Sequence, residues 1–169
     1  MKNAYRFLCS LVLAVCSLNA CAADQAADFF GFRPGMTRAE GDAVAKSRGF
    51  SINDLGGQVM YKGKVPGLAD KAFNVYYPGD KLNRVYFVEW GRTSPKDVEH
   101  MSPEAIHAEE KVLLNEFNKK YGSKAPNYKR RVDDGDVFHT WKFPGKGSVV
   151  MKVGEGASVL EVEYSTDGQ

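Results

Sequence analysis

A loop ends and a helix begins within the segment Gly31-Phe32-Arg33-Pro34-Gly35-Met36-Thr37-Arg38-Ala39-Glu40. Pro34-Gly35 interrupts the extended residues before it. Thr37 is placed to act as the N-cap, because its hydroxyl can accept the amide hydrogen of Glu40 while the Glu40 carboxylate accepts the amide hydrogen of Thr37. The pattern T-x-x-E is therefore a capping box, and it predicts a helix from about residue 38 to residue 48.

A weaker start signal of the same kind recurs at Met101-Ser102-Pro103-Glu104. Ser102 is the expected N-cap and Pro103 the first helical residue. An apolar stripe at helical spacing follows, formed by Ile106, Leu113, Leu114, Phe117 and Tyr121. The first helix has a thinner stripe, formed by Ala39, Ala43, Val44 and Ala45. Its Gly41 lowers helix stability by about 1 kcal/mol relative to alanine.

Each expected helix is followed by short segments in which apolar and polar residues alternate, which predicts antiparallel strands. In the first half these segments are 59–61, 72–77 and 84–90, with a loop expected at 62–71. In the second half they are 128–132, 137–142, 149–153 and 160–164. The expected fold class is α+β, with two tandem α-β-β-β repeats whose antiparallel meanders form a shared sheet or two abutting sheets.

The first 23 residues have the order of a secretory signal. Lys2 and Arg6 precede an apolar run at 7–16, and small residues follow at 20–23. The run is too short to span a bilayer, which needs about 20 apolar residues. The expected organisation is a signal peptide at 1–23, a first module at 24–94 and a second module at 95–169. The expected location is the periplasm, with no transmembrane segment in the mature chain.

Two routes of signal processing are open. Signal peptidase would cleave after Ala22 or Ala23, whereas Leu18-Asn19-Ala20-Cys21 resembles a bacterial lipobox in which Cys21 is acylated. Asn19 is unusual within such a box, so the form without a lipid anchor is favoured. All three cysteines of the chain lie within its first 21 residues. The mature domain therefore has no disulfide and depends on a hydrophobic core.

The formal charge of +2 comes from Lys2 and Arg6, because the residues after the signal contain as many basic as acidic side chains. A neutral chain argues against non-specific binding of nucleic acid, which needs a basic face.

No catalytic or metal-binding pattern stands out in the sequence. The three histidines, at positions 100, 107 and 139, lack zinc-ligand spacing, and His107 with Glu104 and Glu110 fits a solvated helix face better than a metal cluster. The segment Asp133-Asp134-Gly135-Asp136 fits a hairpin turn better than a calcium loop. No nucleophile elbow and no glycine-rich phosphate loop are present. We therefore expect no cofactor, no metal and no enzymatic activity.

The segment Phe30-Gly31-Phe32-Arg33-Pro34-Gly35-Met36-Thr37-x-x-Glu40 resembles the G-x-x-x-G-M-T-x-x-[EQ]-V segment of small secreted α/β modules. These include the SmpA/OmlA outer-membrane-assembly lipoproteins and the family of the beta-lactamase inhibitory protein, in which two tandem α-β modules join their sheets to bind an enzyme. The doubled pattern of this chain is similar across nearly all of its mature part. The sequence departs from the family at Gly41, where an apolar helix residue is usual.

The resemblance implies a protein that acts through its surface. It favours a periplasmic inhibitor or immunity protein that neutralises a secreted toxin enzyme, for example a type VI effector with phospholipase activity. The alternative is an outer-membrane-assembly or envelope scaffold protein of SmpA/OmlA type, and an enzyme ranks third.

The expected partner-binding residues are those that strand alternation leaves outside the core. They are Tyr76, Tyr86, Trp90, Phe138, Lys142, Lys152, Glu161 and Glu163. Exposed aromatic residues on one face often mark a surface for a partner protein. If the helices covered this face instead, the same aromatic residues would belong to the core. Alternation alone does not choose between the two faces.

Overall fold

The computed structural model describes residues 28–68, 70–92, 100–124 and 126–166. The predicted signal segment 1–23, with the lipobox cysteine Cys21, lies outside these residues. The predicted boundary between the modules, between residues 94 and 95, lies outside them as well. Among the described residues, no helix is long and apolar enough to cross a membrane.

The described residues form two α-helices and eight strands, and each helix is followed by four strands. In order they are α2 (Arg38–Ser47), β1 (Ser51–Asp54), β2 (Val59–Lys64), β3 (Asp70–Tyr76), β4 (Arg84–Trp90), α3 (Pro103–Tyr121), β5 (Tyr128–Asp133), β6 (Asp136–Phe143), β7 (Gly147–Val153) and β8 (Val159–Ser165). Short 3₁₀ turns, η1 (Pro78–Asp80) and η2 (Glu155–Ala157), precede β4 and β8.

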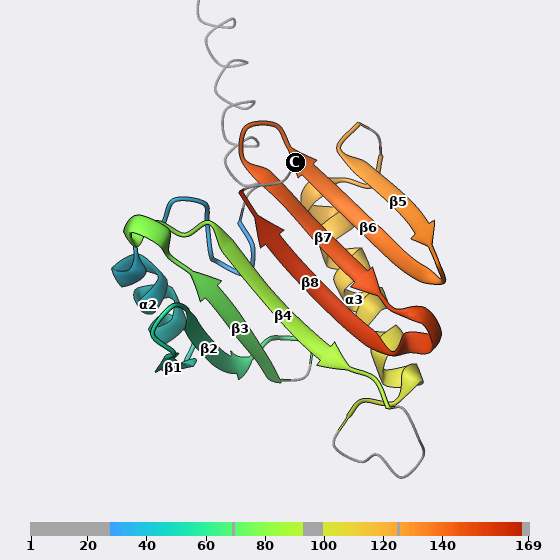
Figure 1. The fold of residues 1–169 in the computed structure, drawn as a ribbon, viewed down its shortest axis with the longest axis horizontal. Coiled ribbons are helices and arrows are strands. Elements are labelled where there is room, and N and C mark those ends of the chain that lie inside the picture. The colour runs from blue at the N-terminus through green and yellow to red at the C-terminus, as the bar shows by residue number, and fades with distance from the viewer. Residues whose placement is uncertain (1–27, 69, 93–99, 125, 167–169) are drawn as a thin grey trace, which may run out of the picture.

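All eight strands form one antiparallel sheet in the order β1-β2-β3-β4-β8-β7-β6-β5. The two four-stranded meanders meet where β4 pairs with β8 (Figure 1). The register at this junction places Phe87 opposite Val162, and both side chains are buried. The expected α+β class and the antiparallel meander are therefore confirmed, and the sheet is a single continuous one.

Two strand boundaries differ from the sequence expectation. Residues 51–54 form β1, which the sequence does not reveal, because its one apolar residue, Ile52, gives no alternation to detect. The loop expected at 62–71 is wrong at both ends, since β2 continues to Lys64 and β3 begins at Asp70. Gly63 fits within β2 because the Phe50 ring packs over it, and a Cβ there would lie 2.2 Å from that ring.

Both helices pack on the same face of the sheet, and Figure 1 shows α3 running behind β6, β7 and β8. The predicted stripe of α3 is buried at Ile106, Leu113, Phe117 and Tyr121, whereas Leu114 is only partly buried. The stripe predicted for α2 is wrong in part. Ala39 and Ala43 are exposed, and the buried residues of α2 are Gly41 and Ala45.

The residues just before α2 add two aromatic side chains to the core. Phe29 and Phe32 are completely buried and hydrogen-bond to each other through their backbones. Phe32 stacks on Tyr61 at a centroid distance of 5.3 Å, while Phe29 lies 6.0 Å from Phe117 on α3. This segment therefore contacts the core under both parts of the sheet, a role that its sequence does not predict.

A buried lysine connects the two halves of the chain. Lys71 on β3 is 0% exposed, and its Nζ lies 2.7 Å from Glu109 Oε2 on α3 and 3.0 Å from Glu89 Oε1 on β4. An unpaired ammonium group in this position would be strongly destabilising. The two carboxylates therefore hold α3 in register with β3 and β4.

Candidate functional site

The face of the sheet opposite the helices, which we call the open face, carries all the residues predicted to bind a partner. Strand pairing places Tyr76 on β3, Tyr86 and Trp90 on β4, Phe138 and Lys142 on β6, Lys152 on β7, and Glu161 and Glu163 on β8. Their strand neighbours, such as Phe87 and Val162, point toward the helices and are buried. The eight side chains therefore lie on the side of the sheet that no described helix covers, and their binding role stays a prediction.

Arg84 organises one cluster on this face, across β3, β4 and β8. The rings of Tyr76 and Tyr86 stack at 6.1 Å, and the Arg84 guanidinium lies 4.9 Å from the centroid of Tyr86. Arg84 Nη2 also donates a hydrogen bond of 2.6 Å to Glu163 Oε2. This contact raises the pKa of Arg84, and burial raises the pKa of Tyr86. The cluster is a cation–π and ion-pair assembly that holds two tyrosine rings in place on the surface.

Phe138 forms a second cluster with two cations. The Arg131 guanidinium lies 4.5 Å from its ring centroid, and Lys152 Nζ lies 5.8 Å from it. Each cation has its own carboxylate, since Arg131 contacts Asp133 and Lys152 lies 2.7 Å from Asp136. The hydrogen bond between Lys152 and Asp136 raises the pKa of the lysine and lowers that of the carboxyl. Both charges are thus fixed beside the aromatic ring.

Trp90 is the most exposed aromatic side chain of the predicted set. It is 60% exposed at the end of β4 and borders a hollow of about 320 Å³, whose other lining residues are Gly91, His100, Ser158 and Val159. A second hollow of about 240 Å³ lies over β6, β7 and β8. An exposed tryptophan next to a concave surface is a common anchor for a partner protein.

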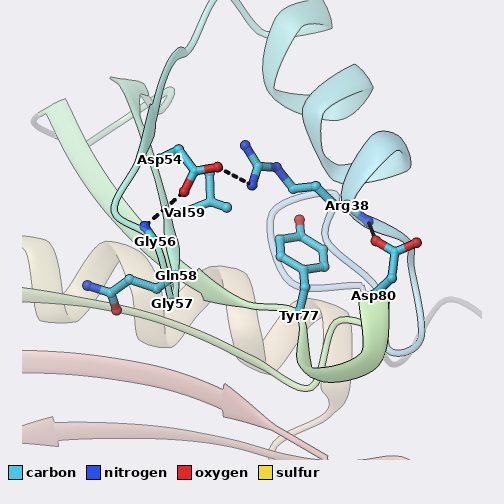
Figure 2. A pocket seen from close by; sticks show the side chains of 8 residues that line it. All are labelled: Arg38, Asp54, Gly56, Gly57, Gln58, Val59, Tyr77 and Asp80. Atoms are coloured by element: carbon cyan, nitrogen blue, oxygen red, sulfur yellow. Dashed lines mark hydrogen bonds and ion pairs between the residues drawn. The ribbon is translucent and has the colours of Figure 1, made fainter.

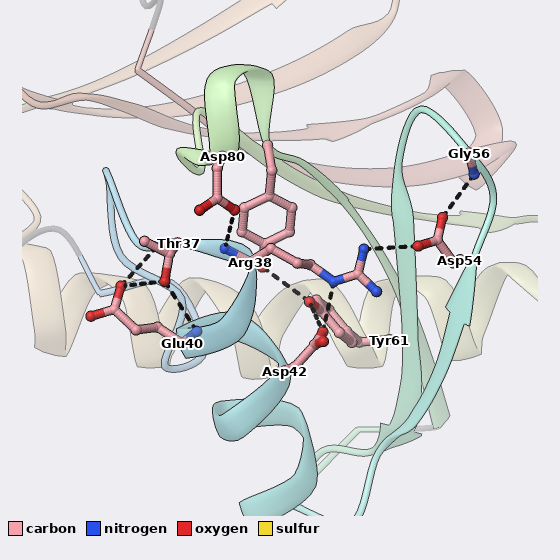
Figure 3. Close-up of polar contacts among 9 residues, drawn as sticks. Thr37, Arg38, Glu40, Asp42, Asp54, Gly56, Tyr61 and Asp80 are labelled. Atoms are coloured by element: carbon pink, nitrogen blue, oxygen red, sulfur yellow. Dashed lines mark hydrogen bonds and ion pairs between the residues drawn. The ribbon is translucent and has the colours of Figure 1, made fainter.

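A polar pocket at the start of α2 is a different candidate. It has a volume of about 270 Å³, and Figure 2 shows its lining residues Arg38, Asp54, Gly56, Gly57, Gln58, Val59, Tyr77 and Asp80. Arg38 contacts Asp42 at 2.8 Å and Asp54 at 3.0 Å, and Asp80 accepts the backbone amide of Arg38 (Figure 3). The charged groups of this pocket are therefore already bound to one another.

Two tyrosine hydroxyls complete the same network. Tyr61 donates to Asp42 at 2.7 Å, and the Tyr77 hydroxyl lies 3.1 Å from that of Tyr61. Burial raises the pKa of both tyrosines, so both stay neutral and neither can serve as a base at neutral pH. A Cβ on Gly41 would lie only 1.8 Å from Tyr77 Oη, which explains why α2 has glycine there. We interpret this pocket as the structural attachment of α2.

Two of the histidines, His107 and His139, lie in a polar contact between α3 and the sheet. Glu110 lies 3.0 Å from His107 Nδ1 and 3.7 Å from His139 Nε2. On the other side of the His139 ring, Tyr128 Oη lies 2.7 Å from Nδ1. The sequence suggests that Glu110 lies on a solvated helix face, but in the structure Glu110 contacts both histidines. Burial lowers the pKa of His139, although Glu110 opposes the shift. Within the part of the chain that the structure describes, no group of three or more His, Cys, Asp or Glu residues could hold a metal ion.

Arg84 and Arg131 hold the aromatic rings of the open face, and the sequence does not predict this role for either of them. Arg131 stands opposite Phe138 in the β5–β6 register, so a hairpin alignment could have found that pair. Arg84 and Glu163 are 79 residues apart, and no local signal connects them.

Aromatic and charged side chains thus gather on the open face. Comparison with protein-family models, with curated proteins and with solved structures finds no match for this chain.

Proposed function

We propose that this protein is an inhibitor or immunity protein of the periplasm, which binds and neutralises a secreted toxin enzyme through its open face. The observation that supports this most directly is Trp90, 60% exposed on the same face as the stacked pair of Tyr76 and Tyr86. Tryptophan, tyrosine and arginine are the residue types that contribute most binding energy at protein interfaces. A type VI effector, for example a phospholipase, is the proposed class of partner.

The order of elements supports a tandem origin for this surface. A helix followed by a four-stranded meander occurs twice, and the last strand of each set, β4 and β8, forms the junction. We propose that the two halves, 24–94 and 95–169, are repeated α/β modules related to the inhibitory-protein and SmpA/OmlA type. Such a union produces one broad open face in place of two narrow ones.

The proposed location has its own test. The basic, apolar and small-residue order of residues 1–23 supports export, with the unlipidated product preferred. Intact-mass measurement of the periplasmic fraction should show a chain that begins near Ala23 or Asp24. A diacylglycerol adduct on Cys21 would establish the lipid-anchored form, and a full-length cytosolic chain would refute export.

Capture from the native organism tests the function. The tagged protein should recover one secreted enzyme, in a stoichiometric complex in which the enzyme is inactive. Combining Trp90→Ala with Tyr86→Ala should weaken binding more than 100-fold, because each anchor contributes about 2 kcal/mol or more. The melting temperature should change little, since both side chains lie at the surface.

The matched control replaces Lys111 and Val112, two exposed residues of α3, with alanine. This variant should bind the enzyme as the unchanged protein does. If the Trp90 and Tyr86 variant folds and binds normally, the open face is not the interface. If deletion of the gene weakens outer-membrane assembly and exposes the cell to no toxin, the envelope scaffold of SmpA/OmlA type replaces the inhibitor.

A further inference from the structure

The hollow over β6, β7 and β8 has an apolar floor and charged walls. Phe138 and Val150 supply the apolar surface, while Lys152, Glu161 and Glu163 supply the charges. The register places Lys152 directly opposite Glu161, and Val150 directly opposite Glu163. Its volume of about 240 Å³ is small for a whole ligand, whose pockets usually exceed about 300 Å³. One side chain of a partner is a better match in size.

Two of the three charged side chains of this hollow form ion pairs within the protein. Lys152 is bound by Asp136 at 2.7 Å, and Glu163 is bound by Arg84 at 2.6 Å. The Glu161 carboxylate makes no hydrogen bond or ion pair with any other residue that the structure describes, although Lys152 acts on it electrostatically across the ladder. The hollow therefore presents one half-buried carboxylate whose charge is not neutralised by direct contact.

Arg84 shows, on the same face, which group fits such a carboxylate. Its guanidinium lies over the Tyr86 ring and donates to Glu163, the open-face residue next to Glu161 along β8. At Glu161 the residue opposite on β4 is Val88, and no guanidinium of a described residue binds the carboxylate. A planar guanidinium can bind a carboxylate and lie on an aromatic ring at once, which an ammonium group does less well.

We propose that the hollow receives an arginine side chain of the partner protein. Its methylene groups lie on Val150 and Phe138, and its guanidinium binds Glu161 as Arg84 binds Glu163. This inference rests on the proposed function, because it names the chemistry by which the open face recognises that partner. It assigns to Glu161 a direct contact with the partner, whereas Glu163 already has a contact within the protein.

The chemistry of the hollow can be tested on the isolated protein with N-propylguanidinium as the probe. Titration followed by NMR should give saturable shifts at the Val150 methyl groups and the Phe138 ring. Glu161→Gln should weaken the probe's binding at least tenfold, since it removes a charge-assisted hydrogen bond. Glu116→Gln, on the exposed side of α3, is the matched control and should leave the binding unchanged. n-Butylammonium should bind more weakly than the guanidinium probe.

A second variant guards against an effect of folding. Val150→Phe fills the hollow without changing its charge, and it should remove the shifts of the Phe138 ring while Glu161 stays in place. Unchanged binding in Glu161→Gln, or shifts located elsewhere, would overturn the proposal. Capture that is lost in the Trp90 and Tyr86 variant but unaffected by Glu161→Gln would also overturn it, and would leave the proposed function standing. Probe binding at the hollow without any captured enzyme would support the chemistry and count against the inhibitor function.

Discussion

Helices α2 and α3 lie on the same face of one sheet, yet different interactions hold them there. The 19-residue α3 buries an apolar stripe, whereas the 10-residue α2 buries only Gly41 and Ala45. Hydrogen bonds to Tyr61 and Asp54, and the close approach of Tyr77 to Gly41, replace the missing apolar surface of α2. The difference shows that two halves with the same order of elements can use unrelated residues, which agrees with the slight sequence similarity between them.

The largest expected effect concerns the apolar attachment of α3. Phe117 is 3% exposed and lies 5.3 Å from the Trp141 ring and 5.6 Å from the Tyr121 ring. Phe117→Ala should lower the free energy of unfolding by about 3–5 kcal/mol, because it leaves a cavity among these rings. Denaturant unfolding measures this change, and Leu114→Ala, at a partly buried position, should cost less. A loss below about 1 kcal/mol for Phe117→Ala would mean that α3 is not held by its stripe.

A side chain added at Gly41 should weaken the packing of α2 on the sheet. Gly41→Ala raises helix propensity by about 1 kcal/mol, yet it places a methyl group 1.8 Å from Tyr77 Oη. We expect a net loss of about 1–3 kcal/mol, as for other overpacked sites. Tyr77→Phe removes the clashing oxygen, so the double variant should recover part of the loss. Ala43→Gly, on the exposed side of α2, isolates the propensity effect, and full tolerance of Gly41→Ala would refute the close approach.

The two N-caps give a smaller and directly matched comparison. Thr37 and Glu40 form both hydrogen bonds of a capping box, whereas Ser102 accepts the amide of Ala105 without completing such a box. Thr37→Ala should cost about 1 kcal/mol, and Ser102→Ala should cost less because the apolar stripe of α3 keeps that helix in place. Thermal unfolding of the two variants under one condition tests the order. The reverse order would show that α2 does not depend on its cap.

The smallest expected effect is a dependence on pH in the contact between α3 and the sheet. His139 faces Glu110 from α3, which also contacts His107, and it faces Tyr128 and Arg130 from β5. Burial holds its pKa below the ordinary value of 6.5, so the folded state takes up a proton less readily than the unfolded state. Stability should therefore fall as the pH drops from about 6.5 toward the pKa of the folded state.

His139→Asn should remove this part of the pH dependence, and Glu110→Gln should strengthen it, because Glu110 favours the protonated form. Unfolding measured between pH 7.5 and 5.5 compares the slopes. Equal slopes in all three proteins would show that His139 does not report on this contact.

The features that the sequence predicts correctly depend on interactions between residues close to one another in the chain. The capping box at Thr37 and the Ser-Pro start at 102–103 specify both helix starts within a few residues, and the structure has them there. The alternation expected over 137–142 is also present, since His139 and Trp141 are buried on one side of β6. The attachment of α2 could not be predicted, because Gly41 depends on Tyr77, a residue that no periodic pattern connects with it.

The candidate site shows the same division. The predicted aromatic and charged residues share one face, because the period of a strand is two. Their grouping into clusters depends on which strands are neighbours, and the pairing of β4 with β8 brings Arg84 to Glu163. The apolar floor of the hollow at Val150, and the Glu161 carboxylate without an ion pair to a described residue, also become visible only once β6, β7 and β8 are aligned.

The place of β8 in the middle of the sheet has a consequence for synthesis. The ribosome synthesises the chain from its N-terminus, so β1 to β4 are made before β8. The edge of β4 therefore stays unpaired until β8 has been made and pairs with it. Open strand edges are sites of aggregation, and long-range pairing is slow to form. The sheet is therefore complete only after β8 has been synthesised, and a truncation that removes β8 would leave two separate meanders with their inner edges exposed.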